Sequence, residues 1–309
     1  MSTLMRVADT PNYNSAMRSI MQTQDKLAKN LNQMSTGYKV DSFSGIASES
    51  QSYLNLRVQS VLTGGNAEEL NRVDSRLGFV EDQVKAISQH IASTRVRLTA
   101  ALNPTQNDTG FSTFAEDELD FIQTVLNMKD AQNQALFGGT RTDSNACDLS
   151  LMGPPGLSPS YAYALDSDES RTVSIGNEKE ISYDILARDD AFAEYIYSLQ
   201  LIRDNQPSPD PHSPAYQNLQ RALEHLKKAD VATAELIDKV GTTRKNIGDM
   251  RDIYQEDQKY SEEMSMEMIS VDPAEAIIKM IQLQVQLGAT LHATREIVSN
   301  QQAINILGR

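Results

Sequence analysis

The stretch LNRVDSRLGFVEDQVKAISQHIASTRVRLTAA, residues 70–101, decides the fold class of this chain. Ten positions in this stretch follow one another at alternating steps of three and four residues, and all but one of them are apolar. They are Leu70, Val73, Leu77, Val80, Val84, Ile87, Ile91, Thr94, Leu98 and Ala101, of which only Thr94 is polar. This spacing predicts an amphipathic helix with a narrow apolar stripe. Extended back through Leu54, past Gly64-Gly65, the helix covers about 50 residues, or about 75 Å. Such a length is typical of a rod rather than a compact globule.

Helices at both ends of the chain carry similar stripes. Near the N-terminus the predicted seam consists of Tyr13, Met17, Ile20, Leu27, Leu31 and Met34. Near the C-terminus it consists of Ile277, Ile281, Leu287, Leu291, Val298, Ile304 and Leu307. An amphipathic helix commonly packs in the core of its own domain. Long, narrow seams also suit burial against neighbouring chains, so self-association is the competing hypothesis and these are predicted assembly seams.

Prolines divide the chain into three parts. Seven of the ten lie between Pro154 and Pro214, and a proline inside a helix removes a hydrogen bond and clashes with the preceding turn. The same region has alternating stretches rich in β-branched and aromatic residues, which predict short strands. We therefore predict a mainly α fold, with an N-terminal helical assembly region (1–140), a small β-rich middle domain (141–212) and a C-terminal helical assembly region (213–309). The long terminal helices would pair as a coiled-coil rod.

Capping patterns predict where several helices begin. A cap residue followed by proline occurs at three places: Thr10-Pro11, Ser213-Pro214 and Asp272-Pro273. Thr113 with Glu116 forms a capping-box pattern and predicts the start of a third helix. We expect that helix to close at Gly138-Gly139.

Composition disfavours several classes of function. The chain has 28 basic and 42 acidic residues, and a net charge of −14 repels nucleic-acid backbones. No apolar run approaches the roughly 18 to 20 residues that cross a bilayer, so membrane insertion is not expected. The first ten residues lack the basic and apolar regions of a secretory signal. If the protein leaves the cell, we expect export without a cleaved signal peptide.

Catalytic and metal-binding patterns are not apparent in the sequence. The four histidines show no metal-ligand spacing, and there is one cysteine, Cys147, in a polar stretch that would not lower its pKa. The acidic run 116–120 is interpreted as a solvated helix start. We therefore predict no catalytic residue, no metal and no cofactor, and we do not expect an enzyme.

Three segments resemble a known family, the bacterial flagellins and their hook-associated relatives. Residues 34–42, with Ser35 and Gly37, resemble the signature that follows the first helix of flagellins. Residues 240–247 are similar to the family's returning-helix motif through Gly241, Arg244 and Asn246. The helix predicted from Asp272 resembles the family's terminal helix in its start and its glutamine-rich body.

A fourth segment favours one branch of this family. The run Leu136-Phe137-Gly138-Gly139-Thr140 resembles the segment typical of hook-filament junction proteins rather than of filament subunits. The resemblance implies a structural adaptor that joins hook to filament by coaxial packing of its terminal helices, located outside the cell in the bacterial flagellum. It implies type III export and, as partners, further copies of the chain in a ring or tube, a neighbouring hook-associated protein and flagellin. A secretion chaperone at the C-terminal helices before export is implied as well.

Two alternative functions stay open at this stage. A filament flagellin would share the terminal seams. A cytoplasmic coiled-coil scaffold would form stable dimers and stay inside the cell.

Overall fold

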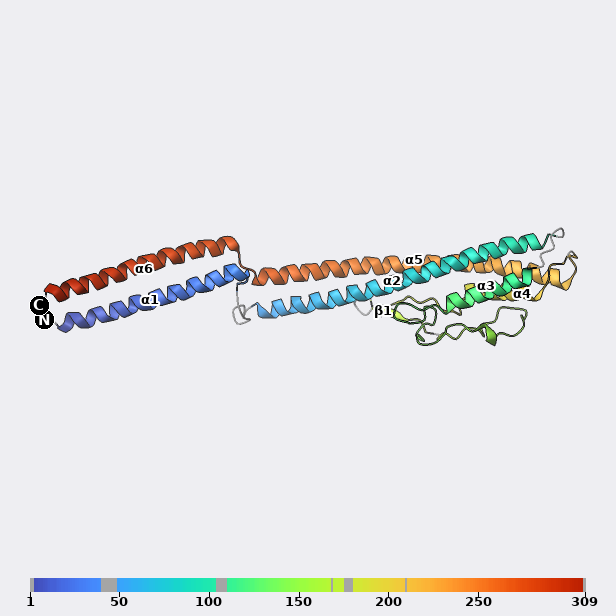
Figure 1. Cartoon of the computed structure of the whole chain (residues 1–309), viewed down its shortest axis with the longest axis horizontal. Coiled ribbons are helices and arrows are strands. Elements are labelled where there is room, and N and C mark those ends of the chain that lie inside the picture. Colours follow the sequence, from blue (N-terminus) through green and yellow to red (C-terminus); the bar gives the residue numbers. More distant parts are fainter. Residues whose placement is uncertain are drawn as a thin grey trace. The chain divides into compact units, whose positions relative to one another are not determined.

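A computed structural model describes residues 3–39, 49–103, 110–167, 169–174, 180–208 and 210–307, with side chains of the terminal helices described from Tyr13 to Ser299. The helices are α1 (Thr3–Thr36), α2 (Ser50–Ala101), α3 (Phe111–Leu126), α4 (Asp190–Asp204), α5 (Pro214–Ile269) and α6 (Pro273–Leu307), with a short 3₁₀ turn, η2 (Leu149–Leu151). Two short strands are β1 (Thr172–Ser174) and β2 (Glu180–Ser182) (Figure 1). The prediction of a mainly α fold is therefore confirmed.

The chain divides into two compact units. The terminal unit comprises residues 1–62 and 257–309, and the central unit comprises residues 63–256. Their boundaries do not follow the three predicted regions, because α2 and α5 each contribute to both units. The assembly roles assigned to those regions stay predictions.

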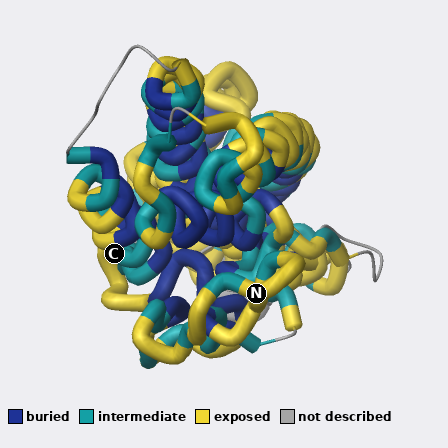
Figure 2. Tube along the Cα trace, turned by 90° about the vertical axis from the view of Figure 1, so that its right-hand side faces the viewer, coloured by how far each residue is buried: buried dark blue, intermediate teal, exposed yellow. Residues whose placement is uncertain are grey.

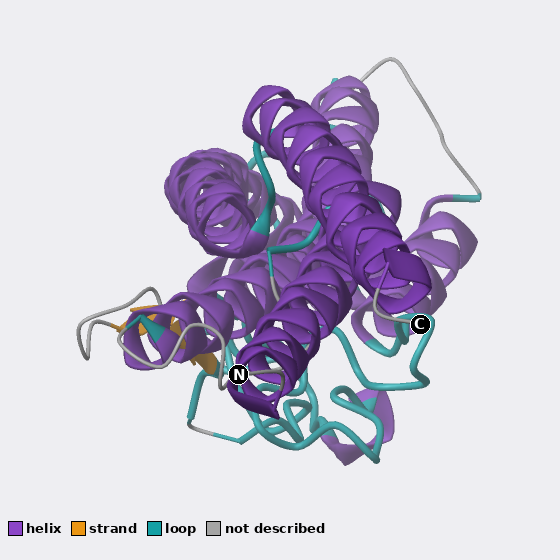
Figure 3. Ribbon diagram, turned by 90° about the vertical axis from the view of Figure 1, so that its left-hand side faces the viewer, coloured by secondary structure: helices purple, strands orange, loops and turns teal. Residues whose placement is uncertain are grey.

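The terminal unit is built on the antiparallel pair of α1 and α6, which lie side by side (Figures 1 and 3). Gly37 ends α1: its φ of +76° is left-handed, and its N–H donates to the Gln33 carbonyl at 2.8 Å. The Gly37 carbonyl then accepts the Val271 N–H at 2.9 Å, and Tyr38 forms a bridge with Ser270. The end of α1 is thus hydrogen-bonded to the segment that precedes α6.

The central unit holds a continuous apolar core (Figure 2). Every member of the predicted stripe from Leu70 to Ala101 is buried, at most 7% exposed. Antiparallel α5 faces this stripe with Leu226, Val240 and Ile247, and α3 packs against α4. Full burial of one such aliphatic side chain stabilises a fold by about 1.5–3 kcal/mol, which explains why this periodic helix holds the unit together.

Segment 141–212 does not confirm the predicted β-rich domain. Its described residues contain a single antiparallel hairpin, in which Val173 pairs with Ile181, besides α4 and irregular loops. The alternating stretch 161–165 forms turns and one isolated bridge between Cys147 and Ala164. There the buried Tyr163 donates its hydroxyl to the Ala187 carbonyl at 3.0 Å, so it anchors a loop rather than a strand.

Two of the three predicted cap-proline starts are confirmed. The Ser213 hydroxyl accepts the Tyr216 N–H at 3.1 Å, and the Asp272 carboxylate accepts the Ala274 N–H at 2.8 Å. The start predicted at Thr10-Pro11 is wrong, because α1 already begins at Thr3. The fixed φ of proline is helical, so a proline inside a helix costs a hydrogen bond without forcing a new start.

The predicted third helix is wrong at both ends. Helix α3 begins at Phe111 after Gly110, without a side-chain cap, and ends at Leu126 rather than at Gly138-Gly139. The Asn127 side chain accepts the N–H groups of Ala146 and Cys147 at 2.9 Å. This side chain ties the end of the helix to a distant loop, and the chain turns away from the helical path.

Candidate assembly surfaces

The structure distributes the predicted seam residues over two kinds of environment within the terminal unit. Ile20 is buried, and Met17, Leu27, Met34, Leu287 and Val298 are partly buried. Exposed members are Tyr13, Leu31, Ile277, Ile281 and Leu291. Ile304 and Leu307 lie outside the residues whose side chains are described. Part of the two predicted stripes meets between the helices, where Tyr13, Met17 and Ile20 of α1 line one hollow with Leu291 and Val298 of α6. The role of these residues in assembly stays a prediction.

The contact between α1 and α6 uses smaller and more polar residues than predicted. Thr23, Asn30 and Thr294 are buried in the terminal unit, together with Ala276 and Leu283. The buried side of α1 follows Ile20, Thr23, Leu27, Asn30 and Met34 in steps of three and four residues. It contains Thr23 rather than the neighbouring Gln24, and Asn30 rather than the predicted Leu31. A periodicity search that counts apolar residues alone misses these positions. One that also accepts small and polar residues at steps of three and four would include them.

Helix α6 carries a second, exposed apolar stripe, which we call the α6 face. It consists of Ile277, Ile278, Ile281, Val285 and Leu291, which are 43–68% exposed. At 100° per residue this stripe is centred about 145° around the helix from the buried line through Ala276 and Leu283. Leu291 lies at its edge and also lines the hollow between α6 and α1. Contiguous exposed apolar side chains on one face of a helix are typical of an interaction surface.

Exposed apolar side chains concentrate in the terminal unit as a whole. Of the 22 large apolar residues that are exposed among the described side chains, 15 belong to this unit, although it is the smaller of the two. Its buried residues, in contrast, include several polar ones. Large apolar side chains, which the central unit buries, are thus exposed on the terminal unit.

Arg244 of the returning-helix motif fastens α5 to α2 in the central unit. Its guanidinium donates to Asp74 at 2.8 Å and to Glu81 at 2.7 Å. It also lies over Gly78, where an added Cβ would be 3.4 Å from the guanidinium carbon. Hydrogen bonds from Lys85 and then Arg244 lower the pKa of Glu81, and the two carboxylates raise the pKa of Arg244. The motif arginine therefore has a structural role within one chain.

The other two motif residues of this helix are on the surface. Gly241 and Asn246 are exposed, and an added Cβ at Gly241 would meet nothing within 4 Å. Packing inside the chain therefore does not require glycine at position 241. Ser35, near the end of α1, is likewise exposed, whereas Gly37 is required by its left-handed backbone.

The Leu136–Thr140 segment is part of the core of the central unit. Leu136 and Phe137 are fully buried, and Phe137 meets Phe192 edge to face at 5.7 Å. Gly139 has a φ of +59°, and an added Cβ would lie 2.5 Å from the Glu169 carbonyl oxygen. At Gly138 a Cβ would collide with the Arg141 carbonyl. The two glycines are thus required for a tight internal turn, not for a helix end.

Thr140 closes this turn against the neighbouring loop. Its N–H donates to the Glu169 carbonyl at 3.1 Å, and its hydroxyl donates to Ser167 at 2.7 Å. The residue is itself exposed, so its hydrogen bonds, rather than burial, position it. All five residues of the segment therefore contribute to one packed junction.

A buried ion network that the sequence did not suggest holds this segment to α2. Arg76 pairs with Asp130 and donates to the carbonyls of Ala135 at 2.6 Å and Leu136 at 3.2 Å. Asp184 lies 3.9 Å from Arg76 and accepts a bidentate pair of hydrogen bonds from Arg171. Carboxylates at positions 130 and 184 lie far apart in the sequence, so no local pattern reveals the network.

Two further titratable groups lie within the packing of the central unit. Glu118 accepts hydrogen bonds from Tyr195 at 2.7 Å and pairs with His90 at 2.8 Å inside the helix packing. Cys147 is buried, and desolvation followed by the charge of Asp148 raises the pKa of its thiol to about 12. In the described part of the chain, no group of three or more histidine, cysteine or acidic side chains could hold a metal ion. None of the helices, as far as they are described, has the length and apolarity to cross a membrane.

Comparisons with known proteins agree with the resemblance at the level of the fold. No family model and no curated protein matches this chain. Among solved structures, a protein of Vibrio parahaemolyticus assigned as a flagellar hook-associated protein aligns with a TM-score of 0.61 at 18% identity, over 72% of this chain and 99% of that one. FlgL of Bacillus cereus aligns with a TM-score of 0.51 at 14% identity, over 70% and 99% of the two chains. The chain therefore has a fold similar to that of flagellar hook-associated proteins.

Proposed function

We propose that this protein is a structural component of the bacterial flagellum, an adaptor that joins hook to filament through its terminal helices. The observation that carries the proposal is the exposed α6 face of the terminal unit. The shared fold with flagellar hook-associated proteins and the sequence motifs at residues 34–42 and 240–247 support it independently. No reaction is part of this role.

The α6 face explains why assembly would need many copies. Its five side chains are about half exposed, so covering them contributes about 0.8–1.5 kcal/mol each, or about 4–8 kcal/mol in total. Association of two proteins costs about 4–15 kcal/mol in lost freedom. One such contact is therefore marginal. In a ring or tube each copy gains contacts on two sides, and the assembly becomes stable only when neighbours are present.

The proposed partners follow from this position in the flagellum. Further copies of the chain would cover the terminal helices laterally, and a neighbouring hook-associated protein and flagellin would contact its two ends. A secretion chaperone would cover the C-terminal helices before type III export without a cleaved signal peptide. Segment 141–212 would face outward, as the resemblance implies.

Substitutions on the α6 face test the proposal in the source bacterium. Ile281→Asp with Val285→Asp is expected to abolish incorporation into flagella, because both residues would carry charge into the contact. Gln282→Asp with Gln286→Asp is the matched control, since both glutamines are exposed on α6 and lie off the stripe. Immunolabelling of isolated flagella measures incorporation. Normal incorporation of the first variant would refute the proposal, provided that the control is also incorporated.

Electron microscopy of the purified protein separates the alternatives. An adaptor is expected to give monomers or short rings after seeding and salting-out. Long tubular filaments would instead identify a filament flagellin. Stable dimers at low concentration, together with retention of the protein inside the cell, would identify a cytoplasmic scaffold.

A further inference from the structure

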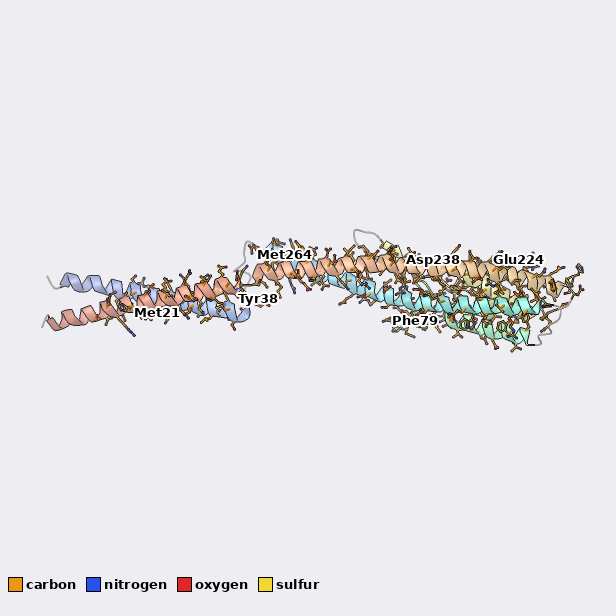
Figure 4. All side chains as sticks on the ribbon, turned by 90° about the horizontal axis from the view of Figure 1, so that it is seen from above. Met21, Tyr38, Phe79, Glu224, Asp238 and Met264 are labelled. Atoms are coloured by element: carbon orange, nitrogen blue, oxygen red, sulfur yellow. The ribbon has the colours of Figure 1, made fainter. Side chains whose placement is uncertain are left out.

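A groove on the central unit has a charge opposite to that of the whole chain. It lies between α2 and the loop 129–132 and has a volume of about 580 Å³. Phe79 lines it and is 44% exposed, and Figure 4 shows its place on α2. Arg72 and Lys129 also line it, and within the described residues neither side chain has a carboxylate partner. Arg76 and Asp130 at its base neutralise each other. We call this surface the Phe79 groove.

The same unit has a complementary stripe on α5. Ile253 is 49% exposed and lies between two exposed carboxylates, Asp249 four residues before it and Glu256 three residues after it. This spacing places the three on one face of the helix. Asp252 next to them is paired with Arg251 at 2.9 Å, whereas Asp249 and Glu256 have no cationic partner among the described side chains. The stripe is therefore an apolar residue flanked by free negative charge.

The two surfaces are complementary in chemistry. One offers an aromatic ring with two free cations, and the other an aliphatic side chain with two free carboxylates. On α5 the two carboxylates are seven residues apart, which is about 10 Å along the helix, and Ile253 lies between them. An acidic segment would complement this cationic groove.

We infer that the Phe79 groove of one copy receives the Asp249–Ile253–Glu256 stripe of a second copy. The two surfaces are different patches of the same chain, so the contact is heterologous and joins successive copies into a ring or an open array. The inference rests on the proposed function, because it supplies a contact between central units in addition to the α6 face of the terminal unit.

Charge reversal in the full-length chain tests the contact. Arg72→Glu with Lys129→Glu makes the groove negative, and Asp249→Lys with Glu256→Lys makes the stripe positive. Each pair is expected to weaken self-association at low salt by about tenfold or more, because like charges then oppose each other. Sedimentation velocity over a range of concentrations measures the association. Lys227→Glu with Lys228→Glu changes the net charge as the groove pair does, on exposed residues outside the groove, and is expected to change association less than about twofold.

Combining the substitutions separates a specific contact from net charge. The groove pair and the stripe pair together reverse both sides and are expected to restore association to within about threefold of wild type. The Lys227 and Lys228 pair combined with the stripe pair has the same net charge but no complementary groove, and is expected not to restore it. Circular dichroism checks that each variant keeps its helix content.

Three results would overturn the inference. One is a groove pair that associates as well as the Lys227 and Lys228 control. Another is equal rescue by the two fourfold variants. A third is a weakened groove pair with an unaffected stripe pair, which would mean that the groove receives a different acidic segment of the second copy. If Ile281→Asp with Val285→Asp still prevents association in these cases, the proposed function stands and only the groove contact fails. A wild-type chain that stays monomeric at every concentration would also overturn the groove contact, whereas the proposed function is tested separately by incorporation into flagella.

Discussion

Replacing Asn30 by leucine is expected to stabilise the pairing of α1 with α6. Asn30 is 2% exposed, and neither its amide nitrogen nor its carbonyl oxygen has a hydrogen-bond partner. A buried polar group without a partner costs about 1–3 kcal/mol. Leucine has nearly the same branched shape, so Asn30→Leu removes this cost without overpacking, and it adds roughly 1 kcal/mol of apolar burial. The expected gain is about 2–4 kcal/mol.

Hydrogen exchange read by mass spectrometry measures this gain locally. Amides of α1 that exchange when α1 separates from α6 should slow by about 30-fold to 1,000-fold, since about 1.4 kcal/mol corresponds to a factor of ten. Gln24→Leu is the matched control, because Gln24 lies on the same helix and is exposed. A polar-to-leucine change there is expected to shift stability by less than about 0.5 kcal/mol. Exchange in Asn30→Leu that is no slower than in Gln24→Leu would refute the reasoning.

Three further predictions concern the central unit. Gly139→Ala is expected to destabilise the unit by about 2 kcal/mol or more in urea unfolding, because the φ of Gly139 is +59° and the Glu169 carbonyl is too close for a Cβ. The control Gly65→Ala lies in open space on α2 and should stabilise the unit by about 0.5–1 kcal/mol. Equal effects of the two substitutions would contradict the assignment of the turn. Hydrogen bonds from Lys85 and then Arg244 lower the pKa of Glu81 in the folded state. Its contribution to stability is therefore present above the unfolded pKa of about 4.5 and is lost as the pH falls through the lower folded value. Arg244→Met should reduce this acid loss in thermal unfolding measured from pH 6 to 3, and Arg244→Met with Lys85→Met should reduce it further; an unchanged pH profile in the double variant would argue against these contacts. Cys147, buried and with its thiol pKa raised to about 12, should resist iodoacetamide at pH 8 until urea unfolds the unit, and rapid labelling of the folded protein would contradict its burial.

The central helix could be predicted from sequence because its pattern and its burial coincide. Every position of the stripe from Leu70 to Ala101 is buried, and the predicted length of about 50 residues agrees with the 52 residues of α2. The helix starts at Ser213-Pro214 and Asp272-Pro273 could also be predicted, because there too the local pattern agrees with the structure. In both, a local hydrogen bond from a backbone N–H to the side chain of the cap residue decides the structure, and no distant contact competes with it.

The Leu136–Thr140 segment shows where local reasoning fails. Two adjacent glycines are typical of a helix end, but here their role depends on carbonyl groups at positions 141 and 169 that the fold brings near them. The ion network of Arg76 likewise joins residues from α2, the loop after α3 and the segment before α4. Neither could be inferred without knowing which distant segments meet.

The terminal helices show a different limit, because one helix there carries two stripes. Apolar periodicity found Ile277, Ile281 and Leu291, which are exposed, and passed over Ala276 and Thr294, which are buried. A seam search identifies side chains that favour burial. It does not identify whether the chain itself or another molecule buries them.

That ambiguity has a physical consequence for the terminal unit. The intrachain contact places Thr23, Asn30 and Thr294 between α1 and α6, while the α6 face keeps five large aliphatic residues in water. Because the gain from apolar burial follows the area removed from water, pairing α1 with α6 leaves much of the available stabilisation unused. A neighbouring copy that covers the α6 face would gain it. The net charge of −14 opposes that approach between isolated chains, so a high local concentration at a growing end favours the contact where free monomers do not form it.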